Sequence, residues 1–320
     1  MNVKANEIER VEDLSVGVFS QEYLKKSCPV IATGAMEDWP ALGKWDFDWF
    51  SAEFGGLSVL AQIGERLTGS WQEMRLDTAI RRMRVDEDRV CIRQFQVFDQ
   101  RPDLLEYVPN PRYCPKDRWI MPSLWLSPQG SIQPFHQDNL TPFDGVANCL
   151  AQVCGRKSVR LVSPEYDDAM DRYPSGNSNS HFSRLDGSWA DLQSHAKLDE
   201  VPVWHGELRA GDILFIPCRY WHFLESHSES VSVSYWWRPS RIADLVFSIR
   251  AQRNAADLRA FIRANQKLVT VEDVEDFGGI SQVSAGLQTM SLSERKIMLT
   301  MLSDEAIALL DALSHASIKT

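Results

Sequence analysis

Residues 134–145 read PFHQDNLTPFDG and place a histidine and an aspartate two positions apart among apolar and turn residues. In a β-strand, side chains at positions i and i+2 point to the same face of the sheet. His136 and Asp138 can therefore reach one common point, while Gln137 faces the other way. An imidazole and a carboxylate that converge in this way are candidate metal ligands, and a hydrogen-bonded pair without a metal is the alternative.

A metal held by only two protein ligands would bind weakly, so a third ligand is expected on a neighbouring strand. The candidate is His222, in the stretch FIPCRYWHFLES. Two histidines and one carboxylate that leave open coordination positions form the facial triad of non-haem Fe(II) oxygenases. The other histidines lie in expected loops or near the end of the chain, without a carboxylate at ligand spacing: His181, His195, His205, His227 and His315.

The sequence around these residues predicts many short strands. Between about residues 88 and 240, apolar or alternating runs are separated by Pro and Gly: VCIRQFQVF, SLWLS, NCLAQVC, KSVRLVSP, GDILFIP and SVSVSYWW. This pattern is typical of a β-sandwich or barrel, so the expected fold is mainly β with flanking helices. Residues 19–56 predict an α/β preamble, and residues 174–190, which are small and polar, predict a long surface loop over the strands.

Lys157 begins the expected strand KSVRLV, on the same face as Val159 and Leu161. A lysine that faces inward needs an anion, because an unpaired buried charge is very costly. The sequence offers no obvious acidic partner, which favours the carboxylate of a ligand. The alternative is that Lys157 tips outward at the strand end and keeps its ammonium in water.

After Pro239 the pattern becomes helical. Apolar residues recur at helical spacing from Ile242 to Ile249, and Ser291 and Glu294 have capping-box spacing before a second apolar run that reaches Leu313. We therefore predict a catalytic domain over residues 1–240 and an annex of two amphipathic helices over residues 241–320. The apolar stripe packs on the catalytic domain or forms a homodimer contact, and both alternatives stay open.

The composition excludes several classes of partner. The chain has 320 residues, of which 44% are hydrophobic, and a net charge of -10, which argues against nucleic-acid and anionic-membrane binding. It has no run of roughly 18 uncharged apolar residues, and its first residues contain no apolar signal-peptide core. The six cysteines are scattered without a CxxC pair, and a reducing cytoplasm is the expected location.

The motifs, taken in order, resemble a known family. FQVFDQRPDL, LWLSPQGSIQPFHQD, NCLAQVCGRKSVRLVSP, GDILFIPCRYWHFLES and SVSYWW are similar to the JmjC-domain hydroxylases of the cupin-8 group over about residues 15–240. The resemblance implies a double-stranded β-helix, or cupin core, that binds Fe(II) through His136, Asp138 and His222 and uses 2-oxoglutarate and O2. It also implies that Lys157 and Asn148 bind 2-oxoglutarate.

The resemblance further places Gln94, Trp125 and Trp236 on the substrate side of the pocket, with Gln133 at its wall. Two positions depart from the family pattern, because Cys91 replaces a usual tyrosine and Gln133 a usual serine or threonine, both of which supply hydroxyls near the cosubstrate.

Two further departures concern the substrate. Gln62 aligns with the acidic residue of the arginyl hydroxylases, and since a neutral amide pairs poorly with guanidinium, arginine is not the expected substrate. Residues 140–145 form an insertion that is expected to help select the substrate.

The expected function is hydroxylation of an unactivated C–H bond on a protein or peptide side chain. Two alternatives stay open: hydroxylation of a small molecule or a carrier-bound amino acid, and metal binding without catalysis, since the altered positions Cys91 and Gln133 adjoin the site. Demethylation would use the same oxidant, but no aromatic cage is apparent in the sequence.

Overall fold

The computed structural model describes residues 3–85, 89–114, 122–138, 146–174, 176–238, 241–242, 245–246, 249, 255–276, 279–308 and 310. The chain divides into two compact units. The first comprises Met1–Asp138 and Ala147–Trp237, and the second contains the C-terminal residues from Arg238. The insertion at residues 140–145 lies outside the described residues, so its expected role stays a prediction.

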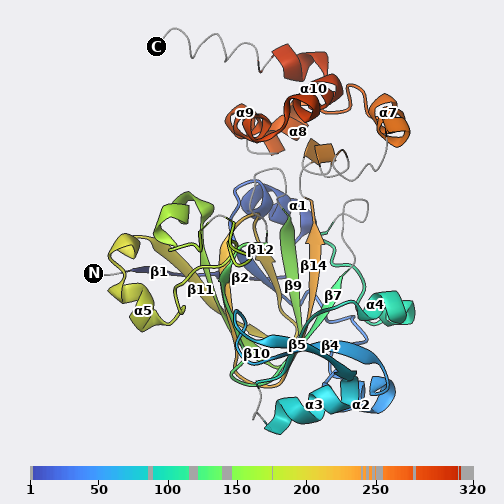
Figure 1. The fold of residues 1–320 in the computed structure, drawn as a ribbon, viewed down its shortest axis with the longest axis vertical. Helices are drawn as coiled ribbons and strands as arrows, with labels where there is room; N and C mark the ends of the chain where they lie inside the picture. Colours follow the sequence, from blue (N-terminus) through green and yellow to red (C-terminus); the bar gives the residue numbers. More distant parts are fainter. Residues whose placement is uncertain are drawn as a thin grey trace. The chain divides into compact units, whose positions relative to one another are not determined.

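The first unit is built from two β-sheets (Figure 1). The five-stranded sheet has the order β1 (Lys4–Glu7), β11 (Pro202–Arg209), β10 (Arg156–Val162), β13 (Trp221–Ser226) and β8 (Ile132–His136). The nine-stranded sheet has the order β2 (Glu9–Glu12), β3 (Val30–Thr33), β12 (Ile213–Ile216), β9 (Ala147–Cys154), β14 (Ser230–Trp237), β7 (Ser123–Ser127), β6 (Cys91–Phe95), β4 (Ser58–Ile63) and β5 (Ser70–Arg75).

Most neighbouring strands are antiparallel, but β1 pairs with β11 and β2 with β3 in parallel. The predicted cupin core is confirmed, as two mixed sheets; the described strands do not close into one barrel.

Alternation along the strands explains how the two sheets enclose a cavity. On β14, Val231, Val233 and Tyr235 belong to a large apolar core on the outer face of the nine-stranded sheet. The residues between them point the opposite way, and Ser234 and Trp236 line a cavity that residues of the five-stranded sheet also line. The period-two pattern of SVSVSYWW therefore separates a structural face from a functional face.

Helices cover the outer face of the nine-stranded sheet with aromatic and aliphatic side chains. They are the π-helix η1 (Phe19–Leu24), α2 (Phe47–Phe54), α3 (Leu76–Val85), α4 (Val97–Gln100) and η2 (Pro102–Glu106). The short α1 (Val16–Val18) leads into η1 and buries no side chain. The predicted order of helix, strand and helix over residues 19–56 is confirmed by η1, β3 and α2.

The segment over the five-stranded sheet contains η4 (Pro164–Ala169), a long loop, α5 (Trp189–Ser194) and η5 (Ala196–Leu198). The loop expected at residues 174–190 is present up to Ser188, because α5 begins at Trp189, and it is more than a polar surface loop. Phe182 and Leu185 are buried, and Leu185 packs with Trp221 and Phe223 in a second core. These two apolar residues among many polar ones anchor the loop to the sheet.

The second unit differs from the prediction of two helices. Its described residues form α7 (Ala255–Ala264), α8 (Val271–Asp276), α9 (Gly279–Thr289) and α10 (Leu292–Met301). The capping box of Ser291 and Glu294 is confirmed at the start of α10. However, α10 ends at Met301, because Leu302 becomes extended and pairs with Val269.

The stripe at Ile242, Leu245, Val246 and Ile249 is buried in the core of the second unit itself. It therefore does not support a dimer contact. None of the helices in the described part of the chain is long and apolar enough to span a membrane.

Candidate metal centre and active site

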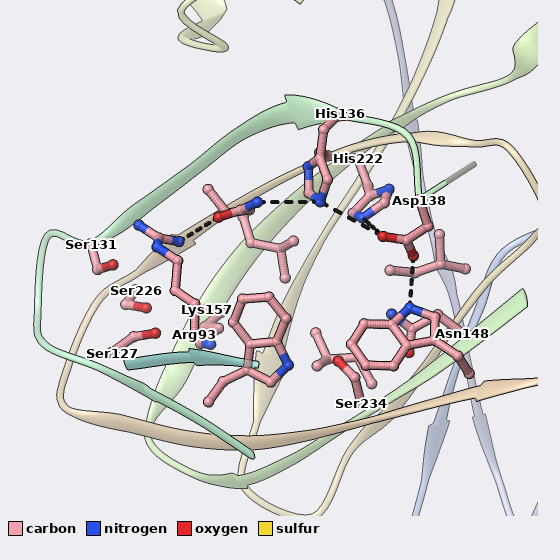
Figure 2. Close-up of a pocket in the computed structure, with 16 residues that line it drawn as sticks. Arg93, Ser127, Ser131, His136, Asp138, Asn148, Lys157, His222, Ser226 and Ser234 are labelled. Atoms are coloured by element: carbon pink, nitrogen blue, oxygen red, sulfur yellow. Dashed lines mark hydrogen bonds and ion pairs between the residues drawn. The ribbon is translucent and has the colours of Figure 1, made fainter. Parts of the chain in front are cut away.

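The three predicted metal ligands meet at one end of the cavity (Figure 2). His136 ends β8, Asp138 follows it, and His222 lies on β13 directly opposite His136 in the strand pairing. Their ligand atoms all lie within 4.8 Å of one another. The Asp138 Oδ1 atom is 3.9 Å from His136 Nε2 and 3.7 Å from His222 Nε2.

Backbone carbonyls fix the histidine rings in the form that binds metals. His136 Nδ1 lies 2.9 Å from the Pro134 carbonyl and 3.1 Å from that of His222, and His222 Nδ1 lies 3.0 Å from the Tyr220 carbonyl. Because a carbonyl only accepts hydrogen bonds, both Nδ1 atoms carry the proton, and both Nε2 lone pairs face the carboxylate.

Burial, helped by the neighbouring His222, lowers the pKa of His136 well below its usual value, which keeps the ring neutral. Two imidazoles and one carboxylate on one side of a cavity fit a divalent iron.

Trp236 holds the third ligand in place. Its indole Nε1 donates a hydrogen bond to Asp138 Oδ2 at 2.9 Å, so the other carboxylate oxygen, Oδ1, faces the histidines. The family resemblance implies that Trp236 lies on the substrate side of the pocket, but its bond to the carboxylate of Asp138 could not be predicted from sequence spacing. Hydrogen bonds of this kind orient metal ligands and tune affinity.

The cavity beside the three ligands has about 500 Å³ of empty space, including its open mouth. It lies between the two sheets and is lined by Arg93, Trp125, Ser127, Ser131, Gln133, His136, Asp138, Asn148, Leu150, Lys157, Ile216, His222, Leu224, Ser226, Ser234 and Trp236. Among the described residues of this lining, Asp138 is the one acidic residue.

Lys157 points into the cavity and is only 5% exposed, so it does not tip outward. Burial, and then the charge of Arg93, lower the pKa of Lys157 to about 7. Asn148 lines the same cavity, and its Oδ1 has no hydrogen-bond partner among the described residues. Unpartnered polar groups around an internal space indicate a ligand.

A bulge in β8 brings Gln133 to the cavity wall. The pairing of β8 with β13 shifts between His222 and Leu224, so Gln133 and His136 face the same side although they are three residues apart. The Gln133 Nε2 atom lies 3.3 Å from His136 Nε2. Trp125 lies across from Trp236, with their ring centroids 6.4 Å apart, and both line the cavity as the sequence predicts.

Gln94 is not brought to the site. Its side chain is exposed and does not line the cavity. The backbone of Gln94 has a positive φ of 49°, and the pairing of β6 with β7 is irregular between Ile92 and Phe95, so the simple alternation of the strand is lost there. Its expected place on the substrate side therefore has no geometric support.

Arg93 lines the cavity and was not among the sequence candidates. Its Nε donates to Gln62 Oε1 at 2.6 Å, its Nη1 donates to Gln133 Oε1, and its Nη2 donates to the Ile132 carbonyl at 3.1 Å. A single arginine inside the apolar strand VCIRQFQVF is the sequence signal that could have identified it.

Residues 16–242 match the family model described as a cupin-like domain. The chain is 32% identical over 244 residues to "Lysine-specific demethylase 8" of Danio rerio, which covers 72% of this chain and 58% of the relative. It is 30% identical to "Lysine-specific demethylase 8" of Xenopus tropicalis, over 68% of this chain and 50% of the relative. It is also 30% identical to "Lysine-specific demethylase JMJ30" of Arabidopsis thaliana, over 72% of this chain and 54% of the relative. The chain thus spans about half the length of these curated relatives.

Proposed function

This chain belongs to the cupin-like domain family, whose JmjC members use Fe(II) and 2-oxoglutarate, and from this premise we propose that it hydroxylates an unactivated C–H bond of a protein or peptide side chain. The observation that carries the proposal is the convergence of His136, Asp138 and His222 at one end of a cavity whose wall also carries the buried Lys157. This combination suits a metal at one end and a carboxylate beside it.

Different residues along the cavity would bind the metal, bind the cosubstrate and exclude water from the substrate. His136, Asp138 and His222 would hold Fe(II), which with 2-oxoglutarate and O2 supplies the oxidising power for C–H hydroxylation. Lys157 and Asn148 bind and orient the cosubstrate, Lys157 through its charge and Asn148 through the N–H groups of its side-chain amide. Trp236 keeps the carboxylate of Asp138 turned toward the histidines, while the apolar faces of Trp125 and Trp236 exclude water from the substrate.

The cavity is better suited to a neutral or anionic target than to a free guanidinium. Gln62, which aligns with an acidic residue in the arginyl hydroxylases, is fully buried and donates to the carbonyls of Glu65 and Arg66 at 3.2 and 2.8 Å. Its Oε1 accepts from Arg93. Since this amide is fully engaged and Asp138 would be a metal ligand, the described residues of the lining offer no free carboxylate for an arginine substrate.

Demethylation of a lysine side chain is the second candidate, because three relatives carry "Lysine-specific demethylase" in their names. Hydroxylation of an N-methyl carbon gives a hemiaminal that releases formaldehyde, so one oxidation serves both outcomes. Two tryptophan rings at 6.4 Å offer aromatic faces to a methylated ammonium. A small-molecule hydroxylase is a third candidate for the same cavity.

Product analysis distinguishes these candidates. Purified protein with Fe(II), 2-oxoglutarate and O2 would be given peptide libraries with unmodified and methylated lysines, and the products analysed by mass spectrometry and formaldehyde assay. We expect peptides that gain one oxygen atom without formaldehyde. Formaldehyde in proportion to succinate would favour demethylation, and turnover only with free amino acids would favour a small-molecule substrate.

A further inference from the structure

Two cations face the same end of the cavity. Arg93 projects from β6 of the nine-stranded sheet and Lys157 from β10 of the five-stranded sheet, and both line the cavity. Figure 2 shows them together on the side away from Asp138. Their proximity also appears in their electrostatics, because the charge of Arg93 helps to lower the pKa of Lys157.

Neither cation has an anionic partner in the described part of the chain. The three acceptors of Arg93 are neutral oxygens from two amides and one backbone carbonyl. The ammonium of Lys157 has no hydrogen bond or ion pair with any described residue. Two neighbouring charges of the same sign, one buried on Lys157 and one half-buried on Arg93, are costly unless an anion joins them.

The arrangement of Arg93 leaves it ready to bind an anion. Its bonds to Gln62, Gln133 and Ile132 use the Nε hydrogen and one hydrogen on each Nη atom. One N–H on each Nη therefore remains to donate to a carboxylate, in a charge-assisted hydrogen bond. Because Gln62 is itself held by two backbone carbonyls, the orientation of the guanidinium is fixed before a ligand arrives.

We propose that Arg93 is a second binding residue for the distal carboxylate of the 2-oxo acid, and that it acts together with Lys157 to select a dicarboxylate. This inference rests on the proposed function and extends it to the cosubstrate specificity of the same site. It also gives a physical role to the two departures at Cys91 and Gln133. Where hydroxyl groups are expected from the family resemblance, a guanidinium held by Gln133 supplies the hydrogen bonds.

The amide of Gln62 contributes to the proposed carboxylate-binding site, because it accepts a hydrogen bond from Arg93. A glutamate there would form an ion pair with Arg93 and neutralise it, whereas glutamine holds the guanidinium without cancelling its charge. Glutamine at position 62, in place of the acidic residue of the arginyl hydroxylases, therefore has two effects. It removes a carboxylate that could bind an arginine substrate, and it leaves the charge of Arg93 available to the cosubstrate.

The test measures binding without turnover. Mn(II)-loaded protein under nitrogen would be titrated calorimetrically with 2-oxoglutarate and with 2-oxopentanoate, in which a methyl group replaces the distal carboxylate. Arg93→Gln should weaken 2-oxoglutarate binding by about tenfold or more and leave 2-oxopentanoate binding unchanged. The control Arg75→Gln, at an exposed arginine on β5, should change neither. Unchanged 2-oxoglutarate binding in Arg93→Gln, or equal losses for both ligands, would overturn the proposal.

Gln62→Glu separates a binding role from a structural one. The variant has nearly the same shape and gives Arg93 an anionic partner, but its carboxylate cannot replace the two amide N–H bonds to the Glu65 and Arg66 carbonyls, so the melting temperature should fall somewhat. The affinity for 2-oxoglutarate should fall, while the affinity for 2-oxopentanoate should stay the same. If Arg93 only braces the two sheets, Gln62→Glu will leave the affinity unchanged, and the proposal is wrong. Specific 2-oxoglutarate binding that depends on Arg93 but never leads to oxidation would remove the proposed function and leave this inference standing.

Discussion

Lys157 is the residue whose charge the cavity controls most directly. With its pKa lowered to about 7, its ammonium is fully charged only below neutral pH in the free protein. A bound carboxylate favours the charged form and raises that pKa. We therefore predict that 2-oxoglutarate affinity is greatest below pH 7 and falls as the pH rises above 7, by up to about tenfold per unit. Lys157→Arg stays charged throughout, so calorimetry of the Mn(II)-loaded variant should give a flatter profile; parallel profiles would contradict the assignment.

The same lysine affects folding. In the unfolded chain Lys157 has its ordinary, higher pKa, so burial of its charge costs most below pH 7, and the cost diminishes as the pH rises from about 7 toward that higher value. Lys157→Met should therefore raise the melting temperature of the metal-free protein more at pH 6 than at pH 9. An equal gain at both values would mean that the ammonium is already neutralised by the protein.

Trp236 gives a sharp test of the metal centre. Trp236→Phe removes the bond to Asp138 Oδ2 while it keeps an aromatic ring in the cavity, and we expect Mn(II) affinity to fall by about 10- to 100-fold. Trp125→Phe is the matched control, because Trp125 lines the same cavity and makes no bond to Asp138. Electron paramagnetic resonance of free Mn(II) measures both affinities; similar losses in the two variants would argue against an orienting role for Trp236.

At this scale, the sequence predicted residues that obey strand alternation. Lys157 points inward with Val159 and Leu161, as alternation along β10 requires. His136 and Asp138 do converge, although β8 ends at His136 and Asp138 lies just beyond the strand. Arg93 could not be predicted in the same way. Its strand loses regular pairing before Phe95. The guanidinium is oriented by hydrogen bonds to residues far away in the sequence, such as Gln62, which spacing along the strand does not predict.

Among the elements, the loop between β10 and α5 supports the site. Its Phe182 stacks on the ring of His136, with the centroids 5.3 Å apart. Gly187, near the end of this loop, has a positive φ of 83°, and a Cβ atom there would overlap the ring of Phe223. Sequence composition predicted the loop, but it could not predict the burial of Phe182, because that depends on the sheet beneath.

Gly187→Ala should accordingly lower the melting temperature, and the free energy of unfolding should fall by about 2 kcal/mol or more. Gly176→Ala is the control, since Gly176 also has a positive φ, of 89°, but nothing lies within 4 Å of its added Cβ. Both variants share the backbone cost, so the difference between them reports the clash with Phe223. Equal destabilisation would show that the loop simply moves away.

In the second unit, the sequence pattern predicted where helix α10 begins but not where it ends. The apolar positions from Ile297 onward continue at helical spacing, and the capping box at Ser291 correctly predicted where α10 begins. The pattern carried no signal for the end at Met301, which depends on the pairing of Leu302 with Val269 across the unit. Local capping is readable in sequence, and a tertiary contact is not.

For the whole molecule, the first unit contains every residue assigned to the metal, the cosubstrate and the cavity wall. The second unit buries its own apolar stripe, so the homodimer contact through the C-terminal helices stays a prediction. Light scattering of the full chain tests it: a dimer mass that disappears on truncation after Arg241 would support the contact, and a monomer mass for the full chain would contradict it.

The central claim, that the chain is an Fe(II)- and 2-oxoglutarate-dependent oxygenase, is tested most directly by succinate. Succinate formed from 2-oxoglutarate would be measured with Fe(II) and O2 for the native chain, for Asp138→Ala and for the exposed control Asp99→Ala. We predict turnover in the native chain and the control, and none in Asp138→Ala. Equal succinate from all three would contradict the account, and so would no succinate from a native chain that fails to bind 2-oxoglutarate.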